Sequence, residues 1–165
     1  ACGGGSSSTA TTDPDTNPEM TVSLSGVVYD EELANAEVEV FVGTNPTPVG
    51  SGLTDENGNY QVTLTVSEDV ANQACIIRAV RGDFSLETLP GTVNTVAAAG
   101  TGNTVSSSTL PGLNVTNVST ALLAVIRDAN NGEVPNDQTL IDAAEAAIEA
   151  DSTVQAQLLE LAAAI

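Results

Sequence analysis

The sequence contains no histidine, no lysine and no tryptophan, and it has only two phenylalanines and two tyrosines. Without histidine, a Ser–His or Cys–His nucleophile pair is excluded, and without lysine so are a Schiff base and a Ser–Lys dyad. Carboxylate pairs remain, as in glycosidases, but those enzymes need a shaped cleft around the sugar, which a small aromatic-poor chain is badly equipped to build. We therefore expect that the protein is not an enzyme, and the sequence identifies no small-molecule substrate.

Positive charge is also scarce, since three arginines stand against 22 acidic residues and the formal net charge is −19 at pH 7. This charge repels phosphate backbones and anionic lipid headgroups, so nucleic acid is excluded as a partner. No window reaches the roughly 18 unbroken apolar residues of a membrane-spanning helix. The two cysteines, Cys2 and Cys75, are too few for a disulfide framework and too far apart for a metal knuckle.

The first part of the chain is rich in Gly, Ser, Thr, Asp and Pro. Because such a segment cannot bury enough surface to offset its ordering entropy, residues 1–20 are predicted to be a flexible tether. Acidic and amide side chains alternate in it, as they do in calcium loops, at Asp13, Asp15, Asn17 and Glu19. The glycine turn of an EF-hand is missing, so a weak calcium site and a linker that binds nothing both stay open. We expect no other cofactor.

Alternating apolar residues predict short strands in the next part of the chain, with Pro- and Gly-rich turn chemistry at residues 45–52. In the last predicted strand, Arg78 should face water, so Cys75, Ile77 and Ala79 should face the core. Short strands separated by turn signals are typical of a small β-sandwich, which we place at residues 21–90. The predicted strands are residues 21–29, 36–43, 60–66 and 74–80.

Residues 91–112 are richer in Gly, Thr, Ser and Asn and are interpreted as a connector, with weak strands at 93–99 and 103–110. In residues 113–165 the apolar period changes to that of helices, which predicts three short amphipathic helices. Their N-caps are Thr116 or Asn117, Asn136 or Asp137, and Asp151 or Ser152. The predicted buried stripes are Val118, Leu122, Val125 and Ile126; Leu140, Ile141, Ala144 and Ile148; and Val154, Leu158, Leu161 and Ile165. Because short helices are marginal alone, they should pack on one another or on the sandwich.

Two stretches of the chain resemble known families. The segments "VSLSGVVYDEELANAEVEVF" and "GSGLTDENGNYQVTL" resemble the carboxypeptidase regulatory-like and Cna-B-like domains over about residues 21–81. The matching positions of the family's strands are Gly26, Val28, Ala36, Val38 and Val40, and those of its turn motif are Thr54, Asp55, Gly58 and Tyr60. Gly58 permits a tight turn, after which Tyr60 enters the core. The resemblance implies a prealbumin-like sandwich that serves as a stalk, spacer or adhesion module; the Lys–Asn isopeptide bond of some Cna-B relatives is excluded because lysine is absent.

The opening "CGGGSSS" resembles the start of a mature bacterial lipoprotein, in which the cysteine carries a diacylglyceryl group and a Gly/Ser tether follows. The resemblance implies that Cys2 is lipidated and that the protein lies outside the cytoplasm, at a bacterial cell surface or outer membrane, or in the extracellular space. Ala1 precedes Cys2, so an unlipidated chain also stays open, with Cys2 free or in a disulfide bond to Cys75.

Together these patterns predict a mainly β fold with C-terminal helices: a small prealbumin- or Ig-like antiparallel β-sandwich followed by three short amphipathic helices. The function expected first is a non-catalytic spacer or adhesion module of a surface lipoprotein, bound to a membrane through Cys2. The first alternative is a homo-oligomeric extracellular filament held by strand exchange or helix docking. The second is a glycan- or calcium-binding surface module, of which the glycan form is disfavoured by the absence of tryptophan.

Overall fold

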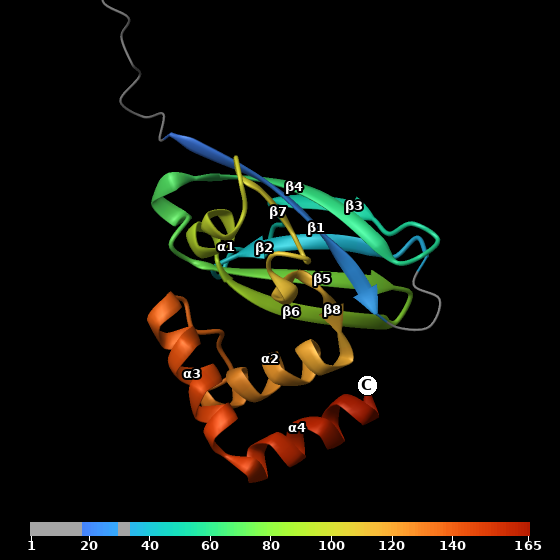
Figure 1. Cartoon of the computed structure of the whole chain (residues 1–165), viewed down its shortest axis with the longest axis vertical. Coiled ribbons are helices and arrows are strands. Elements are labelled where there is room, and N and C mark those ends of the chain that lie inside the picture. The colour runs from blue at the N-terminus through green and yellow to red at the C-terminus, as the bar shows by residue number, and fades with distance from the viewer. Residues whose placement is uncertain (1–17, 30–33) are drawn as a thin grey trace, which may run out of the picture.

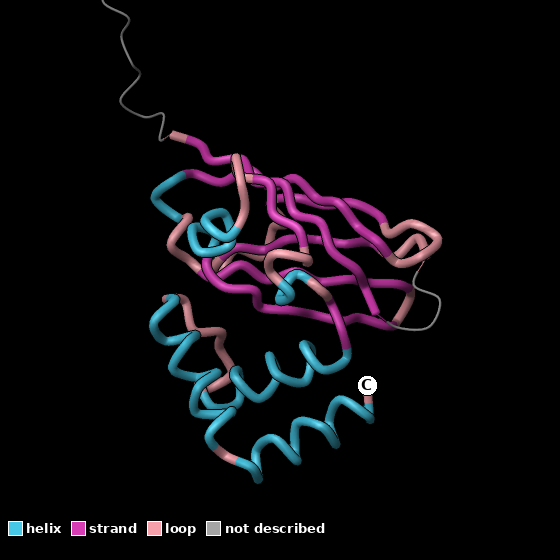
Figure 2. The backbone as a smooth tube through the Cα atoms, in the orientation of Figure 1, coloured by secondary structure: helices cyan, strands magenta, loops and turns pink. Residues whose placement is uncertain are grey.

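The protein is mainly β, with helices gathered in its C-terminal part, which confirms the predicted fold class (Figure 1). The structure is a computed structural model and describes residues 18–29 and 34–165. Two four-stranded sheets pack face to face, and the three long helices lie together at one end (Figure 2). The strands are β1 (Glu19–Tyr29), β2 (Glu37–Val42), β3 (Gly50–Leu53), β4 (Asn59–Ser67), β5 (Ala74–Arg81), β6 (Phe84–Thr92), β7 (Thr104–Ser106) and β8 (Val115–Thr116). The helices are α1 (Val93–Ala99), α2 (Asn117–Ala129), α3 (Gln138–Ala150) and α4 (Ser152–Ala164), with 3₁₀ turns η1 (Glu68–Val70) and η2 (Pro111–Leu113).

The first sheet is built around β1, which pairs with β4 along nearly its whole length. On its other side β1 pairs with the short strands β7 and β8, and both of these run parallel to it. The sheet is therefore mixed, whereas the sequence predicted an antiparallel one. The parallel pairing arises because the connector 91–112 carries the chain back along β1 before the helices begin.

The second sheet has the order β3-β2-β5-β6 and is antiparallel throughout. The prediction that residues 45–52 form only a turn was wrong, because Gly50–Leu53 is a strand. A side chain at Gly50 would come within 2.5 Å of the Thr63 carbonyl oxygen, and one at Gly52 within 2.8 Å of that of Gln61. These glycines are thus needed where β3 lies against the backbone of β4, which closes the sandwich on this side.

The core between the sheets contains the alternating residues that the sequence pattern indicated. Cys75, Ile77 and Ala79 of β5 point into it as predicted. Their neighbours Ala74 and Ile76 are buried as well, because helices cover the outer face of this sheet. The second face of β5 is therefore part of a separate apolar cluster that joins the sandwich to the helices.

Two parts of the chain near the connector differ from expectation. Residues 93–99, predicted as a weak strand, form helix α1, whose N-cap Thr92 accepts a hydrogen bond from the Thr95 amide at 3.4 Å. The segment 103–110 does contain a strand, the three-residue β7. The edge strand β6 had no sequence prediction, and Pro90 near its end suits an edge because proline has no N–H to donate.

The three C-terminal helices lie where they were predicted, and their N-caps are Thr116, Asp137 and Asp151. They pack both on one another and on the sandwich, so the two predicted arrangements coexist. Each of the three predicted buried stripes is wrong in part, because it contains exposed residues. These are Val118 in the first stripe, Leu140 in the second, and Leu161 and Ile165 in the third. Within the described residues, no helix is long and apolar enough to cross a membrane.

Candidate functional site

The turn motif predicted from the sequence forms a hydrogen-bonded loop between β3 and β4. One carboxylate oxygen of Asp55 accepts hydrogen bonds from the backbone amides of Asn57 at 2.8 Å and Asn59 at 2.9 Å. The Asn59 side-chain amide donates to the same carboxylate at 3.0 Å and 3.2 Å. These bonds, chiefly those from Asn59, lower the pKa of the Asp55 carboxyl below its usual value. The Asp55 carboxylate is therefore used to hold the loop.

Thr54 and Gly58 attach the same loop to neighbouring strands. The Thr54 hydroxyl is buried and accepts a hydrogen bond from the Ala36 amide at 2.9 Å, next to the start of β2. Gly58 has φ +78° and lies so close to β1 that a side chain would come within 2.7 Å of the Val28 carbonyl oxygen. Both positions are therefore explained by backbone packing, which supports their interpretation as structural residues.

Tyr60 and Gly26 are opposite each other in the β1–β4 register, and the Tyr60 side chain leaves no room for a Cβ at position 26. The Tyr60 ring passes over Gly26, where an added Cβ would come within 2.9 Å of the ring and 2.8 Å of the Leu113 carbonyl oxygen. The Tyr60 hydroxyl donates to that carbonyl at 2.5 Å. Burial raises the pKa of this hydroxyl well above its usual value. The pair connects the first sheet to η2, from which the chain continues to α2.

Of the residues named in the cysteine and calcium predictions, the structure describes only Glu19 and Cys75. Cys2, Asp13, Asp15 and Asn17 lie outside the described residues, and Glu19 is an exposed residue at the start of β1. Cys75 is fully buried in the core, and its burial raises the pKa of the thiol to about 12. In the part of the chain that the structure describes, no three His, Cys, Asp or Glu side chains are grouped to hold a metal ion.

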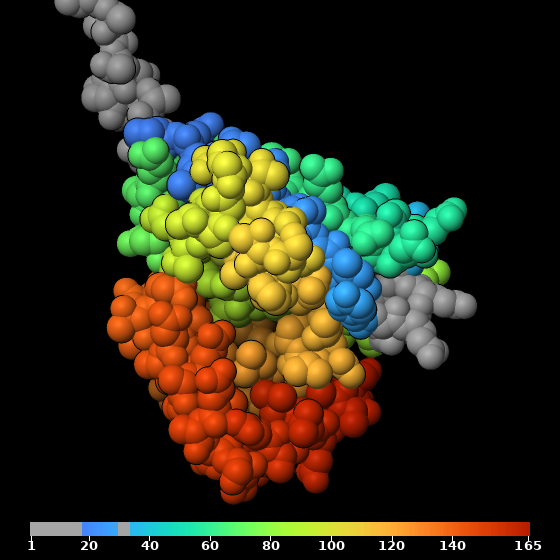
Figure 3. All heavy atoms as spheres, in the orientation of Figure 1, coloured from blue at the N-terminus to red at the C-terminus, as the bar shows by residue number. Residues whose placement is uncertain are grey.

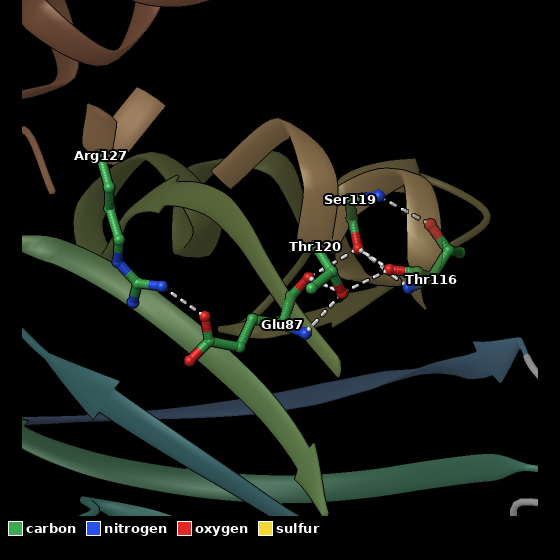
Figure 4. A network of polar contacts seen from close by, with 5 residues as sticks. All are labelled: Glu87, Thr116, Ser119, Thr120 and Arg127. Atoms are coloured by element: carbon green, nitrogen blue, oxygen red, sulfur yellow. Dashed lines mark hydrogen bonds and ion pairs between the residues drawn. The ribbon is translucent and has the colours of Figure 1, made fainter. Parts of the chain in front are cut away.

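The polar contacts between α2 and β6 attach the helices to the sandwich (Figure 4). β6 is the last strand of its sheet, so one side of its backbone faces away from β5. There the Thr120 hydroxyl oxygen accepts a hydrogen bond from the Glu87 amide at 2.9 Å, and the Ser119 hydroxyl donates to the Glu87 carbonyl at 2.7 Å. Both hydroxyls come from the first turn of α2, which Thr116 caps. Side chains of the helix thus take the place of a neighbouring strand at this edge.

One ion pair supports the same junction, and a second lies within the second sheet. Arg127, near the end of α2, contacts the Glu87 carboxylate at 2.5 Å, and Arg78 contacts Glu39 at 3.3 Å on the outer face of the sheet. The Arg78 guanidinium also lies 5.3 Å from the centre of the Phe41 ring, within the range of a cation–π contact. Both arginines are therefore ion-paired with glutamates at the partly exposed surface.

Further hydrogen bonds come from the other helices. The Gln138 side chain of α3 accepts from the Thr92 amide at 2.9 Å, and Asn136, before α3, accepts from the Ala74 amide at 2.9 Å. The Asn117 side chain donates to the Ala162 carbonyl at 3.0 Å and so connects the start of α2 to the end of α4. The helical segment is therefore fastened to the sandwich at several points along its length.

A cleft of about 360 Å³ lies where the sandwich and the helices meet. Its walls come from the end of β1, from β6, from η2 and the segment after it, and from α2 and α3. The hollow between the yellow η2 region and the orange helices opens on the face seen in Figure 3. The lining is mainly apolar, with Leu89, Leu122 and Ile126 among its residues. Of all side chains in the lining, only that of Glu145 is acidic or basic at neutral pH.

No sequence prediction identified this cleft. Its lining residues come from five segments between Tyr29 and Glu145, and they meet only because α2 docks on β6. In the sequence, nothing distinguishes Glu145 from a carboxylate on the solvent-exposed face of a helix. In the structure, burial raises the pKa of its carboxyl above the usual value, and the nearby carboxylates of Asp142 and Glu149 raise it further.

No protein-family model matches this chain, and no curated protein matches its sequence. The resemblance to carboxypeptidase regulatory-like and Cna-B-like domains therefore depends on the motif residues alone and stays a prediction.

Proposed function

We propose that the protein is a non-catalytic spacer or adhesion module of a bacterial surface lipoprotein, anchored in a membrane through Cys2. In this role the N-terminal segment is the tether, the sandwich is a rigid spacer, and the helical segment is the part presented to the surroundings. The proposal includes a location outside the cytoplasm.

The observation that carries the proposal is the placement of the two ends of the sandwich. β1 begins at Glu19 at one end of the molecule, and α2, α3 and α4 lie at the opposite end (Figure 1). A chain anchored before β1 would hold the helices and the cleft away from the membrane. The many hydrogen bonds between β6 and the helices would keep that end in a fixed orientation.

The chemistry of the cysteines supports the same proposal. A disulfide bond requires access to the Cys75 sulfur, but this side chain is fully buried and its thiol pKa is about 12. A buried thiol that stays protonated is a poor nucleophile and acts as a small apolar core residue. This favours lipidation of Cys2 over a bridge between Cys2 and Cys75.

Membrane fractionation of cells that express the full-length gene tests the anchor. We expect the wild-type protein in the membrane fraction and the Cys2→Ser variant in the soluble fraction. Cys75→Ala is the matched control, because it removes the other cysteine and should leave the protein with the membrane. A Cys2→Ser variant that still sediments with membranes, or a Cys75→Ala variant that is released, contradicts the proposal.

A filament subunit remains the second candidate, and one observation favours it. α4 and the residue that follows it leave three apolar side chains exposed, Leu159, Leu161 and Ile165, which a neighbouring subunit could cover. Strand exchange is the weaker route to a filament, because β3 lies against β4 and α2 covers part of the free edge of β6. Negative-stain microscopy of the native protein separates the two candidates, since only the filament candidate predicts regular polymers.

A further inference from the structure

We propose that the cleft between η2, β6 and the helices α2 and α3 binds a small organic cation, an ammonium or guanidinium group on a short apolar body. This site goes beyond the spacer function and uses neither Cys2 nor the tether. It would give the membrane-distal end of the molecule a ligand of its own.

The size and the walls of the cleft suit such a body. Its volume of about 360 Å³ lies within the range of small-molecule pockets, which are typically apolar with a few polar groups that fix orientation. Leu89, Leu122 and Ile126 supply aliphatic surface from β6 and α2. Val118 and Tyr29 are substantially exposed, at 45% and 57%, although both line the cleft. An apolar ligand would cover both of these side chains.

Most polar groups of the lining are already occupied within the protein. The Thr88 hydroxyl donates to the Gly112 carbonyl at 2.8 Å, the Ser119 hydroxyl donates to Glu87, and the Asn114 side-chain oxygen accepts from the Val27 amide at 3.1 Å. Glu145 differs, since its carboxylate has no hydrogen bond or ion pair with any residue in the described part of the chain. The Glu145 carboxylate is therefore the charged group of this apolar cleft that is available to a ligand. Its negative charge is complementary to a cation.

The charges around Glu145 also favour a cationic ligand. Asp142 and Glu149 lie close enough on α3 to act on its carboxyl, and all three are acidic. No lining residue is positively charged, and Arg127 of α2 is held by Glu87 outside the cleft. A bound cation would relieve the repulsion among these carboxylates, and the net charge of −19 would raise its local concentration.

The test is an NMR titration of the full chain in 150 mM NaCl with three probes of equal length, n-hexylammonium, 1-hexanol and hexanoate. We expect hexylammonium to shift backbone amides around the cleft with a Kd on the order of 1 mM, hexanol to bind about tenfold more weakly, and hexanoate not to bind. Glu145→Gln should reduce hexylammonium affinity to that of hexanol. The matched control Glu160→Gln removes one carboxylate from the exposed surface of α4 and should leave the affinity unchanged.

A second variant tests the apolar part of the site. Val118→Trp enlarges an exposed residue at the opening of the cleft, so it should block both hexylammonium and hexanol while the fold remains intact. Three results would overturn the proposal: shifts that scatter over the acidic surface, equal affinities for hexanol and hexylammonium, or a Glu145→Gln variant that binds hexylammonium as the wild type does. None of these results would contradict the proposed membrane anchor, because the Cys2→Ser variant tests that anchor separately.

Discussion

The sandwich and the helical segment are built in different ways. The sandwich has a continuous core between two sheets, in which residues such as Leu24, Leu64 and Ile77 are fully or almost fully buried. The helical segment has a smaller apolar cluster, leaves Leu140 and Leu159 exposed, and depends on side-chain hydrogen bonds to β6 for its position. Short helices are marginal alone, so the helical segment needs the sandwich more than the sandwich needs it. We therefore expect the helices to open before the sandwich unfolds.

The largest effect should come from the core of the sandwich. Ile77→Ala removes fully buried atoms between the sheets and should lower the free energy of unfolding by about 3 to 5 kcal/mol, as measured by urea denaturation. Ile141→Ala in α3 is the matched variant in the helical cluster and should cost about 2 kcal/mol, with increased hydrogen exchange confined to α2, α3 and α4. Equal losses with equal exchange in both regions would remove the distinction between them.

The next effect concerns the pair formed by Gly26 and Tyr60. Gly26→Ala places a methyl group against the Tyr60 ring and the Leu113 carbonyl and should cost about 2 kcal/mol in chemical denaturation. Ser25→Ala on the same strand is the control and should be nearly neutral. If the two variants are equally stable, the close packing at Gly26 does not constrain the sequence.

A smaller loss is expected where α2 docks on β6. Thr120→Val keeps the shape of the side chain but leaves the Glu87 amide without its partner, so it should cost about 1 to 2 kcal/mol. Hydrogen exchange should accelerate at the Glu87 amide and throughout α2, while amides of β1 and β4 keep their protection. Thr153→Val on the exposed face of α4 serves as the control. Unchanged exchange at Glu87 would show that this bond does not hold the junction.

The smallest effect is a pH-dependent one at Glu145. Its pKa is raised in the folded state by burial and then by Asp142 and Glu149, so the ionised form destabilises the fold and the protonated form does not. Glu145→Gln should therefore stabilise the protein at pH 7 by less than about 0.5 kcal/mol, because the group is half exposed. The gain should disappear as the pH falls below the ordinary glutamate value. Thermal melts at pH 7 and pH 3.5 measure it, and a loss of stability at pH 7 would contradict the assigned cause.

Sequence reasoning was most successful for elements with a single buried face, because that face sets the spacing of the apolar residues. The pattern of β1, β2 and β4 alternates because one side of each packs in the core, so their positions could be predicted. β3 could not, because "GSGL" has no apolar alternation and becomes a strand by lying against β4. The apolar run of α1 fits a strand or a helix, and the Thr92 cap decides between them.

The helices and the cleft show a second limit. The sequence predicts where α2 and α3 lie, but their buried faces depend on which neighbours cover them, and Val118 and Leu140 turn out exposed. The turn at Gly58 and the burial of Tyr60 could be predicted because they depend on local turn chemistry and strand alternation. Glu145 could not be selected, since its environment is created by segments distant in the sequence.

The intact mass of the protein isolated from the cells that make it, with and without reductant, tests the proposed anchoring most directly. The account predicts a chain that begins at Cys2 and carries an added mass of diacylglycerol scale, with no change on reduction. An unlipidated chain that gains about two daltons on reduction would show a bridge between Cys2 and Cys75. That result would contradict both the membrane tether and the inert, buried Cys75 described above.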